Sequence, residues 1–404
     1  MITLKIIFWV GLFIVFYAYV GYGLVLFILI KLKRIFKGIP TKPVLPSDDQ
    51  LPEVTFVVAA YNEADYMVEK IKNCLDFDYP KDKINYLFVT DGSDDATPEV
   101  VREYPTPSDV TIRVFHEAAR RGKIAAVERI MAFVETPIVI YTDANTFVNK
   151  MAIRNIVRHY QNPKVGAVAG EKRIELGDKD AANSAGEGIY WKYESTLKKW
   201  DSEMQSVVGA AGELFSIRTA LFEAVAPDTI IEDFYMTLRI AQKGNRVIYE
   251  PEAYAVETSS ASVQEELKRK IRIAAGGIQA IVRLRSLLNI FKYGMLSFQY
   301  ISHRVLRWTL APLFLPIILV TNIVLAAQGS PIYQFLLAGQ VLFYGLALIG
   351  YLLETRKIKM KAFFVPYYFC IMNYAVYRGF FRIMNNNQSV MWERAERLQK
   401  VESE

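Results

Sequence analysis

Polar side chains end three of four short apolar runs in the first half of this 404-residue sequence. The four runs are residues 54–59, 86–90, 111–115 and 138–142. Asn62 and Glu63 follow the first run, Asp91 the second and Asp143 the fourth. Continuous apolar strands with helical spacing between them are typical of an α/β protein with a parallel sheet. Ligands of such sheets bind beyond the carboxyl ends of the strands, so we expect these polar side chains on one rim.

Two of these acidic positions have a chemical interpretation and a plain structural one. Asp91, which precedes Gly-Ser-Asp-Asp, could bond a base or a ribose hydroxyl. The same run is also typical of a turn with a helix N-cap, which is the simpler interpretation when the run is taken alone. Oxygens of Asp143 and Asn145 could share Mg²⁺ or Mn²⁺, which would bridge to substrate phosphates. A turn without a metal is the alternative there.

Three further positions could act on a substrate. Lys123 begins a helix-like run, and both a lysine and a helix N-terminus suit a phosphate, although a solvated cation is the alternative. Asp233, beside Glu232, opens another helical run and could deprotonate an attacking hydroxyl, or simply stabilise the helix dipole. Small residues around Gly212 would let a substrate approach the backbone, or would serve tight packing.

The composition indicates a soluble domain combined with a few membrane segments. Hydrophobic residues make up 52% and charged residues 22%, and the net charge is +6. These values exclude a disordered chain or a disulfide-stapled miniprotein, and they suit neither a purely soluble enzyme nor a transporter. The basic residues cluster beside apolar segments, as in cytoplasmic loops, so we expect no nucleic-acid partner. The 2 cysteines and 3 histidines have no metal-ligand spacing.

Three stretches could lie in or on a membrane. Residues 6–30 are uncharged and long enough to span it, with the basic residues that follow in the cytoplasm. Residues 309–353 are long enough for a hairpin of two spans around a polar turn. Residues 362–377 could form a fourth span or an interfacial helix, and we favour an interfacial or re-entrant segment. Arg272 lies on an amphipathic run that suits the membrane surface, although it could also meet a diphosphate.

These segments predict a cell-membrane protein with several spans and a cytoplasmic catalytic domain. The expected parts are an N-terminal anchor (1–37), a linker (38–50), an α/β domain (51–260), amphipathic interfacial helices (261–308), a transmembrane hairpin (309–353), and a basic loop, interfacial or fourth transmembrane helix and tail (354–404).

Taken together, the motifs resemble a known family in their order and spacing. They are Ala60-Tyr-Asn-Glu63, Val89-Thr-Asp-Gly-Ser-Asp94, Arg121-Gly-Lys123, Thr142-Asp-Ala-Asn-Thr146, Gly209-Ala-Ala-Gly-Glu213, Ile231-Glu-Asp233, Arg269-Lys-Ile-Arg272 and Trp392-Glu-Arg-Ala-Glu-Arg397. This series resembles inverting family-2 glycosyltransferases, in the membrane-embedded branch with cellulose, hyaluronan, chitin-oligosaccharide and poly-N-acetylglucosamine synthases. The resemblance covers residues 51 to about 308.

The resemblance implies a GT-A fold, which is Rossmann-like with a mostly parallel sheet, and a nucleotide-sugar donor, expected to be a UDP-sugar. The implied roles are uridine binding by Ala60, Asn62, Glu63 and Asp91, diphosphate binding by Lys123 and Arg272, Mg²⁺ or Mn²⁺ binding by Asp143 with Asn145, acceptor binding by Gly212, Glu213, Glu232, Trp392 and Arg397, and general base catalysis by Asp233. A proton taken by Asp233 would let the acceptor attack C1 of the sugar and invert it.

Two positions depart from the family pattern. Asn145 stands where the family has a second metal aspartate, which predicts weaker metal binding. The processive enzymes carry Gln-x-x-Arg-Trp, whereas this sequence reads Arg269-Lys-Ile-Arg272-Ile273, without the tryptophan that would stack on an acceptor sugar.

Three functions therefore follow as expectations. The first is an enzyme that extends or synthesises a polysaccharide, with a glycan acceptor, membrane lipids and possible accessory secretion subunits as partners. The second is transfer of one sugar to a lipid acceptor, such as a polyprenyl phosphate or a ceramide-like alcohol. The third is an inactive scaffold that binds nucleotide-sugars.

Overall fold

A computed structural model of the chain describes residues 1–175, 183–258, 262–356 and 361–385. The chain divides into two compact units, and each is interrupted in sequence. One unit contains Leu32–Glu175 and Lys198–Ala261, and the other contains Met1–Lys31 with the described parts of Leu176–Leu197 and Ser262–Gln388. The domain boundaries expected from the sequence remain a prediction.

The first unit is built on one eight-stranded sheet in the order β3-β2-β1-β4-β7-β6-β8-β5. The strands are β1 (Val54–Ala60), β2 (Ile84–Asp91), β3 (Thr111–Glu117), β4 (Ile138–Asp143), β5 (Thr146–Val148), β6 (Val165–Glu175), β7 (Leu214–Arg218) and β8 (Arg246–Thr258). The four predicted strands form the parallel part, with Val54 of β1 opposite Ile84 of β2 and Ile138 of β4. β7 runs antiparallel to β4 and to β6, and β8 is parallel to β6.

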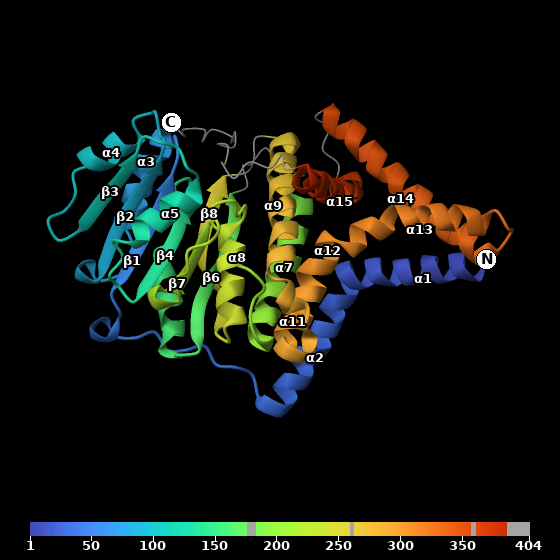
Figure 1. Cartoon of the computed structure of the whole chain (residues 1–404), viewed down its shortest axis with the longest axis horizontal. Coiled ribbons are helices and arrows are strands. Elements are labelled where there is room, and N and C mark those ends of the chain that lie inside the picture. The colour runs from blue at the N-terminus through green and yellow to red at the C-terminus, as the bar shows by residue number, and fades with distance from the viewer. Residues whose placement is uncertain (176–182, 259–261, 357–360, 386–404) are drawn as a thin grey trace. The chain divides into compact units, whose positions relative to one another are not determined.

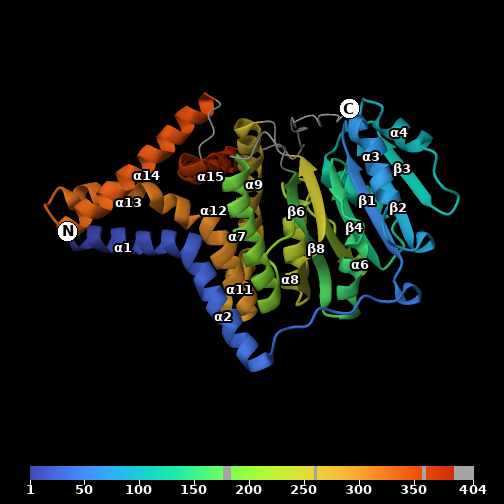
Figure 2. The same ribbon diagram turned by 180° about the vertical axis from the view of Figure 1, so that it is seen from behind.

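Helices cover both faces of this sheet, which explains why its central strands are apolar throughout. The helices are α3 (Ala64–Leu75), α4 (Thr97–Glu103), α5 (Lys123–Met131), α6 (Ala152–Val157) and α8 (Glu232–Gln242). Figure 1 shows α5 and α8 in front of the sheet, and Figure 2 shows α3 and α6 on the opposite face. All seven residues of β1 are buried as a result. The expectation of an α/β domain with a mostly parallel sheet is confirmed.

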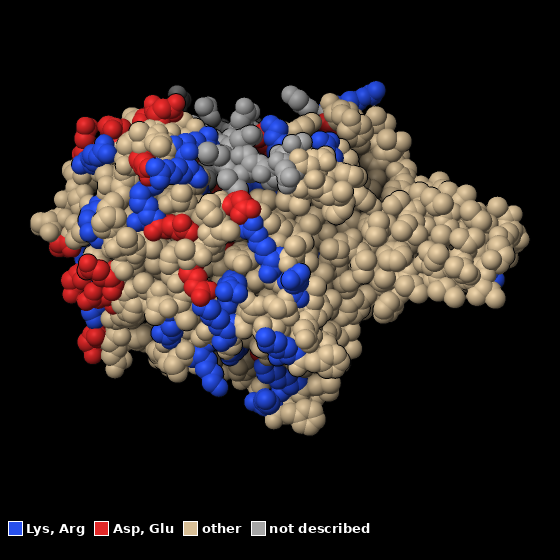
Figure 3. Space-filling view, in the orientation of Figure 1, with Lys and Arg blue, Asp and Glu red and all other residues tan. Residues whose placement is uncertain are grey.

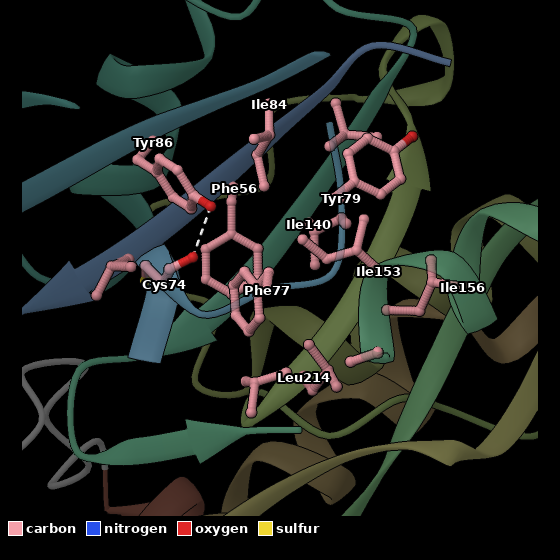
Figure 4. Packing of buried hydrophobic residues seen from close by; sticks show 14 of the residues in the cluster. Phe56, Cys74, Phe77, Tyr79, Ile84, Tyr86, Ile140, Ile153, Ile156 and Leu214 are labelled. Carbon is pink, nitrogen blue, oxygen red and sulfur yellow. Dashed lines mark hydrogen bonds between the residues drawn. The ribbon is translucent and has the colours of Figure 1, made fainter. Parts of the chain in front are cut away.

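The main core lies between β1, β2, β4 and the helices α3 and α6. Phe56 packs edge-on against Phe77, with their ring centres 5.0 Å apart, and Tyr86 lies beside them (Figure 4). The buried Tyr86 hydroxyl donates a hydrogen bond of 2.6 Å to the Cys74 carbonyl, which satisfies both polar groups. Aromatic side chains bury large apolar areas, so this cluster holds α3 on the sheet, with its N-terminal end at the carboxyl rim.

The second unit is helical. Its elements are α1 (Ile2–Phe16), η1 (Tyr17–Gly21), α2 (Tyr22–Lys37), α7 (Asn183–Met204), α9 (Val263–Arg283), η6 (Arg285–Leu288), α10 (Ile290–Tyr293), α11 (Met295–Tyr300), η7 (Ile301–Val305), α12 (Leu306–Trp308), α13 (Leu310–Ala326), α14 (Pro331–Thr355) and α15 (Lys361–Met384). The ends of α2 and α7 extend into the first unit.

The apolar helices of this unit are long enough to cross a membrane. Among the described residues, Ile2–Lys37 and Pro331–Thr355 each qualify by length and composition. Met295–Trp308 and Leu310–Ala326 qualify only together, as a pair bent by 51°. Figure 3 shows almost no charged side chains over α1, α13 and α14 on the face in view. The chain is therefore a membrane protein. The helix α15 does not meet the same test, and whether it spans or lies on the membrane stays a prediction.

A π-helical segment, η1, lies within the long N-terminal helix. A π-helical turn shifts the backbone hydrogen bonds and leaves carbonyl groups open to other donors. Nε of Arg307 donates to the carbonyl of Ala18 at 2.9 Å, and the Tyr193 hydroxyl donates to that of Tyr19 at 2.8 Å. The Tyr17 hydroxyl lies 2.9 Å from Oγ of Ser302, in the second π-helical segment η7. These bonds account for the irregular backbone of η1.

A buried carboxylate holds the same helices together. Glu194 accepts hydrogen bonds from His303 and Arg307, both at 3.1 Å, and Arg304 lies 2.7 Å away. Burial alone would raise the pKa of Glu194, but Arg304 and His303 hold it well below its usual value. Glu194 is therefore ionised and joins α7 to η7 and α12.

Candidate active site

Lys123 is the centre of the candidate site. It is the first residue of α5, and its Nζ lies 2.7 Å from Oδ1 of Asp143 and 3.1 Å from Oε1 of Glu232. Asp143 ends β4, and Glu232 begins α8. Burial alone would lower the pKa of Lys123, but Asp143, Glu232 and Asp233 together raise it above its ordinary value. Lys123 is therefore a permanently charged ammonium among carboxylates.

Asp233 has the electrostatic environment of a general base. Burial and the neighbouring charge of Glu232 raise the pKa of Asp233 to about 7, although Lys123 acts in the opposite direction. A carboxylate with a pKa near neutrality accepts a proton readily while it is still ionised in part of the molecules. Asp233 is the second residue of α8, and its carbonyl accepts a hydrogen bond of 2.7 Å from the hydroxyl of Thr237. The structure therefore gives this side chain both a fixed position and suitable basicity.

Two glycines shape the space beside Asp233. A Cβ on Gly212 would lie 3.1 Å from Nζ of Lys123 and 3.4 Å from Oδ2 of Asp233. The absence of a side chain at Gly212 therefore leaves room next to both charged groups. Gly209 has φ +85°, and a Cβ there would lie 2.0 Å from the Phe234 ring. Only glycine allows this close approach of the loop to the first turn of α8.

The turn between β4 and β5 carries the two expected metal ligands. Asp143 and Asn145 present a carboxylate and an amide oxygen, which are the hard donors that Mg²⁺ and Mn²⁺ prefer. Nδ2 of Asn145 lies 3.5 Å from Oε1 of Glu63. In the parts of the chain that are described, no group of three or more His, Cys, Asp or Glu side chains could enclose an ion. The donor set fits a cation that takes its remaining ligands from substrate phosphates.

The loops after β1 and β2 hold each other through side-chain hydrogen bonds. Nδ2 of Asn62 donates to Asp94 at 2.6 Å, and the Asp94 amide returns a bond of 3.1 Å to Asn62. The Glu63 amide donates to Oγ1 of Thr97 at 2.9 Å. Asn62 has φ 53°, and among the described residues it is the one non-glycine residue with positive φ. Local backbone strain of this kind is common at functional sites, and Asn tolerates it better than most residues.

Asp91 lies beneath the loop that follows β3. It is 1% exposed, and its Oδ2 accepts hydrogen bonds from the Arg121 amide at 3.0 Å and the Gly122 amide at 2.6 Å. Gly92 allows this loop to lie close, since a Cβ there would be 2.5 Å from Cβ of Arg120. The Arg120 guanidinium in turn stacks 3.6 Å from the centre of the Tyr61 ring. Asp91 therefore fixes this loop, and its expected contact with uridine stays a prediction.

Glu213 is held by a buried lysine on a neighbouring strand. Nζ of Lys172 lies 2.5 Å from Oε1 of Glu213 and also pairs with Glu257. The Lys172 side chain is 2% exposed. The pairing fixes the carboxylate of Glu213 just before β7.

The structure brings most of the predicted site residues into one unit. Asn62, Glu63, Asp91, Lys123, Asp143, Asn145, Gly212, Glu213, Glu232 and Asp233 all lie at or near the carboxyl rim formed by β1, β2 and β4. Ala60 is also there, but the residue is only 1% exposed. Arg272 is on α9 in the other unit, so its contact with a diphosphate stays a prediction. Trp392 and Arg397 lie outside the described residues.

Four residues with defined contacts at this rim were not singled out from the sequence. Lys172, Lys70, Arg120 and Tyr61 belong to no run of acidic or glycine residues. One sequence pattern can indicate a buried lysine, namely a position on the apolar face of a helix or within an apolar strand. Lys70 fits this pattern, because it follows Met67 by three residues and so lies on the same helix face. Both side chains are buried in the structure.

The mostly parallel mixed sheet, with helices on both faces, is the arrangement of a GT-A glycosyltransferase domain. Residues 52–276 match the sequence model of the family described as "Glycosyltransferase like family 2". The match covers more than half of the chain, which therefore belongs to this family. The family and the fold predicted from the sequence motifs are confirmed.

Curated relatives are similar over the same region. The chain is 27% identical over 244 residues to poly-beta-1,6-N-acetyl-D-glucosamine synthase of Staphylococcus aureus (strain MSSA476), covering 58% of this chain and 57% of that protein. It is 25% identical over 243 residues to the protein of the same name from Staphylococcus epidermidis. The match thus spans a little over half the length of these relatives.

One solved structure is similar over nearly the whole chain. It is the mannosyltransferase PcManGT from Pyrobaculum calidifontis in complex with GDP-Man and Mn²⁺, with a TM-score of 0.72 and 24% identity. The alignment covers 95% of this chain and 100% of that chain. The likeness establishes a shared fold.

Proposed function

We propose that this chain is an inverting glycosyltransferase that transfers a hexosyl unit from a nucleotide-sugar to a glycan or lipid acceptor in the membrane. The observation that carries the proposal is the position of Asp233. Its carboxylate has a pKa near 7 and lies beside Gly212, opposite a permanently charged Lys123. A base beside a residue without a side chain and near a cation is an arrangement that suits a displacement at a sugar carbon.

In the proposed mechanism, Asp233 takes the proton from an acceptor hydroxyl as the oxygen attacks C1 of the donor sugar. The bond from C1 to the nucleotide phosphate breaks on the opposite face, so a single displacement inverts C1. The transition state resembles an oxocarbenium ion. Lys123 stabilises the negative charge that develops on the departing diphosphate. Glu232, 3.1 Å from Lys123, keeps the ammonium in place and keeps the Asp233 pKa raised.

A divalent cation is part of the proposal. Asp143 and Asn145 would hold Mg²⁺ or Mn²⁺, which would supply Lewis-acid stabilisation of the diphosphate. The structural neighbour that contains Mn²⁺ and GDP-Man supports this assignment. Because Asn145 contributes no full charge, we expect weaker metal binding than with two aspartates.

The donor is proposed to be a nucleotide-sugar, with UDP first and GDP second. The relatives named as N-acetylglucosamine polymer synthases support the first choice, and the neighbour in complex with GDP-Man supports testing the second. The loops that hold Asn62 and Asp91 would bind the nucleoside.

The proposed location is the cell membrane, with several spans and the catalytic domain in the cytoplasm. Basic residues follow the first apolar helix, and further basic residues lie between α14 and α15. Such clusters mark the cytoplasmic side.

Polysaccharide extension is the first proposed reaction, supported by the polymer-synthase relatives. Transfer of a single sugar to a lipid is the second, and a specific observation favours it. Ile273 stands where processive enzymes of this family carry a tryptophan, so a stacking platform for a growing glycan is missing at that position. Both reactions use the same base and donor site.

Nucleotide release by the purified full chain in detergent tests the proposal. UDP-sugars and GDP-sugars are offered singly with Mn²⁺ or Mg²⁺ and a bacterial lipid extract as acceptor source. Metal-dependent release with one donor is expected, and product size decides between a polymer and a singly glycosylated lipid. Measurable nucleotide binding without release for any donor would favour the inactive scaffold over this proposal.

A further inference from the structure

Lys70 is a fully buried lysine behind the candidate active site. It lies on α3, is 0% exposed, and sits over the face of Phe56 with Nζ 5.9 Å from the ring centre. Nζ donates a hydrogen bond of 2.5 Å to the carbonyl of Thr146 and one of 3.2 Å to Oγ1 of Thr142. These two residues flank the turn that contains Asp143 and Asn145, so one ammonium holds both ends of that turn.

The same polar cluster reaches the neighbouring strand. Oγ1 of Thr142 lies 3.0 Å from Oγ1 of Thr146 and donates a bond of 2.9 Å to the carbonyl of Glu213. Oγ1 of Thr146 lies 3.0 Å from the carbonyl of Asp143, to which it donates. Lys70 therefore anchors a network that fixes the expected metal-binding turn and the residue before β7 in a common geometry.

If this position required packing alone, a buried lysine would be energetically less favourable there than an apolar residue. Burial lowers the pKa of Lys70 to about 8, which shows how unfavourable the buried charge is. An unbranched apolar side chain of similar length would fill the same space without that cost, but it would remove the hydrogen bond that Lys70 donates to the Thr146 carbonyl. The network around the ammonium is what an apolar side chain could not reproduce.

We propose that Lys70 is a positioning residue that holds the Asp143–Thr146 turn in the geometry required for binding a divalent cation together with the donor diphosphate. This inference rests on the proposed function, but its structural part concerns the turn alone. Lys70 does not touch the substrate. Loss of the ammonium should free both ends of the turn while α3 and the core around Phe56 stay folded.

The test compares Lys70→Met with Lys72→Met, a matched control for the exposed lysine on the same helix. The first readout is hydrogen–deuterium exchange of peptides covering residues 138–148 in the ligand-free full chain in detergent. We expect exchange in Lys70→Met to be at least tenfold faster at Asp143–Thr146, with a thermal midpoint within a few degrees of wild type. Lys72→Met should match wild type in both measurements.

The second readout is binding of Mn²⁺ in the presence of UDP or GDP, measured by electron paramagnetic resonance without turnover. Lys70→Met should raise the Kd for Mn²⁺ at least tenfold. If Lys70→Met does not fold, Thr142→Val and Thr142→Ser replace it, because valine removes the acceptor for Lys70 at nearly constant volume while serine keeps it. Thr142→Val should then exchange faster and bind Mn²⁺ more weakly than Thr142→Ser.

The outcomes separate this inference from the proposed function. Unchanged exchange in the Lys70 or Thr142→Val variants would overturn the positioning role, as would faster exchange with wild-type Mn²⁺ affinity. If the wild-type protein binds neither UDP nor GDP, the proposed function and the ligand part of this inference are both overturned. Faster exchange in Lys70→Met would then leave Lys70 as a purely structural anchor.

Discussion

The ammonium of Lys123 lies 2.7 Å from Oδ1 of Asp143, so the residue expected to bind the diphosphate is paired with the residue expected to bind the metal. The pair neutralises Asp143 in the absence of ligands. A cation that binds this carboxylate must therefore share it with Lys123 or take its place. The ammonium of Lys123 can then pair with the negatively charged donor phosphates, while Glu232 keeps it near α8.

Replacing the proposed base should stop transfer and spare donor binding. Asp233→Asn removes the proton acceptor but keeps the shape of the side chain, and general bases contribute about 10²–10⁴-fold to rate. We expect kcat to fall by at least about 100-fold, with the Kd for the nucleotide within about twofold of wild type. Asp109→Asn, at an exposed position, serves as the control. Turnover near wild type in Asp233→Asn would rule out this base.

Activity should rise with pH through neutrality. The pKa of Asp233 is raised to about 7, so the ionised base becomes more abundant between pH 6 and 8. The stability of the fold should change in the opposite direction to activity. The folded state favours the protonated carboxyl group of Asp233, so its contribution to the free energy of unfolding is lost as pH rises through about 7. Asp233→Asn should therefore unfold at a higher temperature than wild type at pH 8. A rate independent of pH from 6 to 8 would contradict the assignment.

Removing the central ammonium should change the titration of the base as well as the rate. Lys123 lowers the pKa of Asp233, so Lys123→Met should move the rising limb of the kcat/KM profile to higher pH. It should also reduce kcat, because charge on the leaving diphosphate loses its partner. The profile of Lys164→Met, at an exposed lysine of the same unit, should overlay that of wild type. An unshifted limb in Lys123→Met would show that the two groups do not interact.

A buried ion cluster away from the site should dominate acid stability. Glu250 accepts hydrogen bonds from Arg158 at 2.6 Å and His159 at 2.7 Å. Burial would raise the pKa of Glu250, but these two partners lower it to about 2, so its contribution is present above pH 4.5 and is lost as pH falls toward 2. Glu250→Gln should cost about 3–5 kcal/mol, because it leaves the buried Arg158 with only the half-exposed Glu252 as a charge partner.

The matched control for that variant is a second carboxylate on the same arginine. Glu252 lies 2.8 Å from Arg158, and its side chain is 50% exposed. Glu252→Gln should cost under about 1 kcal/mol, because solvent screens exposed ion pairs. Thermal unfolding of the full chain in detergent compares the two. Equal losses would show that burial does not determine the strength of these pairs.

The parallel half of the sheet was predictable because its strands are buried on both faces. β1, β2 and β4 therefore appear as unbroken apolar runs, and the polar residues that end them fall on one rim. The pairing of the other half, which mixes parallel and antiparallel strands, was not predicted. The position of β7 between β4 and β6 depends on pairings between segments far apart in sequence, which no local pattern encodes.

The charged residues of the candidate site could be predicted from the sequence, but the residues that hold them in place could not. Asp143, Lys123 and Asp233 stand at the starts or ends of elements, where motif spacing predicts function. Lys70 and Lys172 lie inside elements, and a sequence of one protein does not distinguish a buried lysine from a surface one by type alone. The burial of Asp91 was also not predicted, because it results from the loop that carries Arg120 folding over Gly92.

The π-helical segment η1 lets the N-terminal helix hold one residue more than a regular α-helix would between the same two flanks. A π-helical turn contains one residue more than an α-helical turn, whereas each residue added to a regular helix turns the chain by about 100°. Deleting one residue from Tyr17–Gly21 would therefore convert η1 to regular α-helix and leave the faces of α1 and α2 as they are. Phe8 and Gly11 would still pack against α13, but the carbonyls that now accept from Arg307 and Tyr193 would return to the helical hydrogen-bond ladder. Single-residue deletions in η1 should therefore be tolerated better than deletions between Gly11 and η1, which would turn Phe8 and Gly11 away from α13.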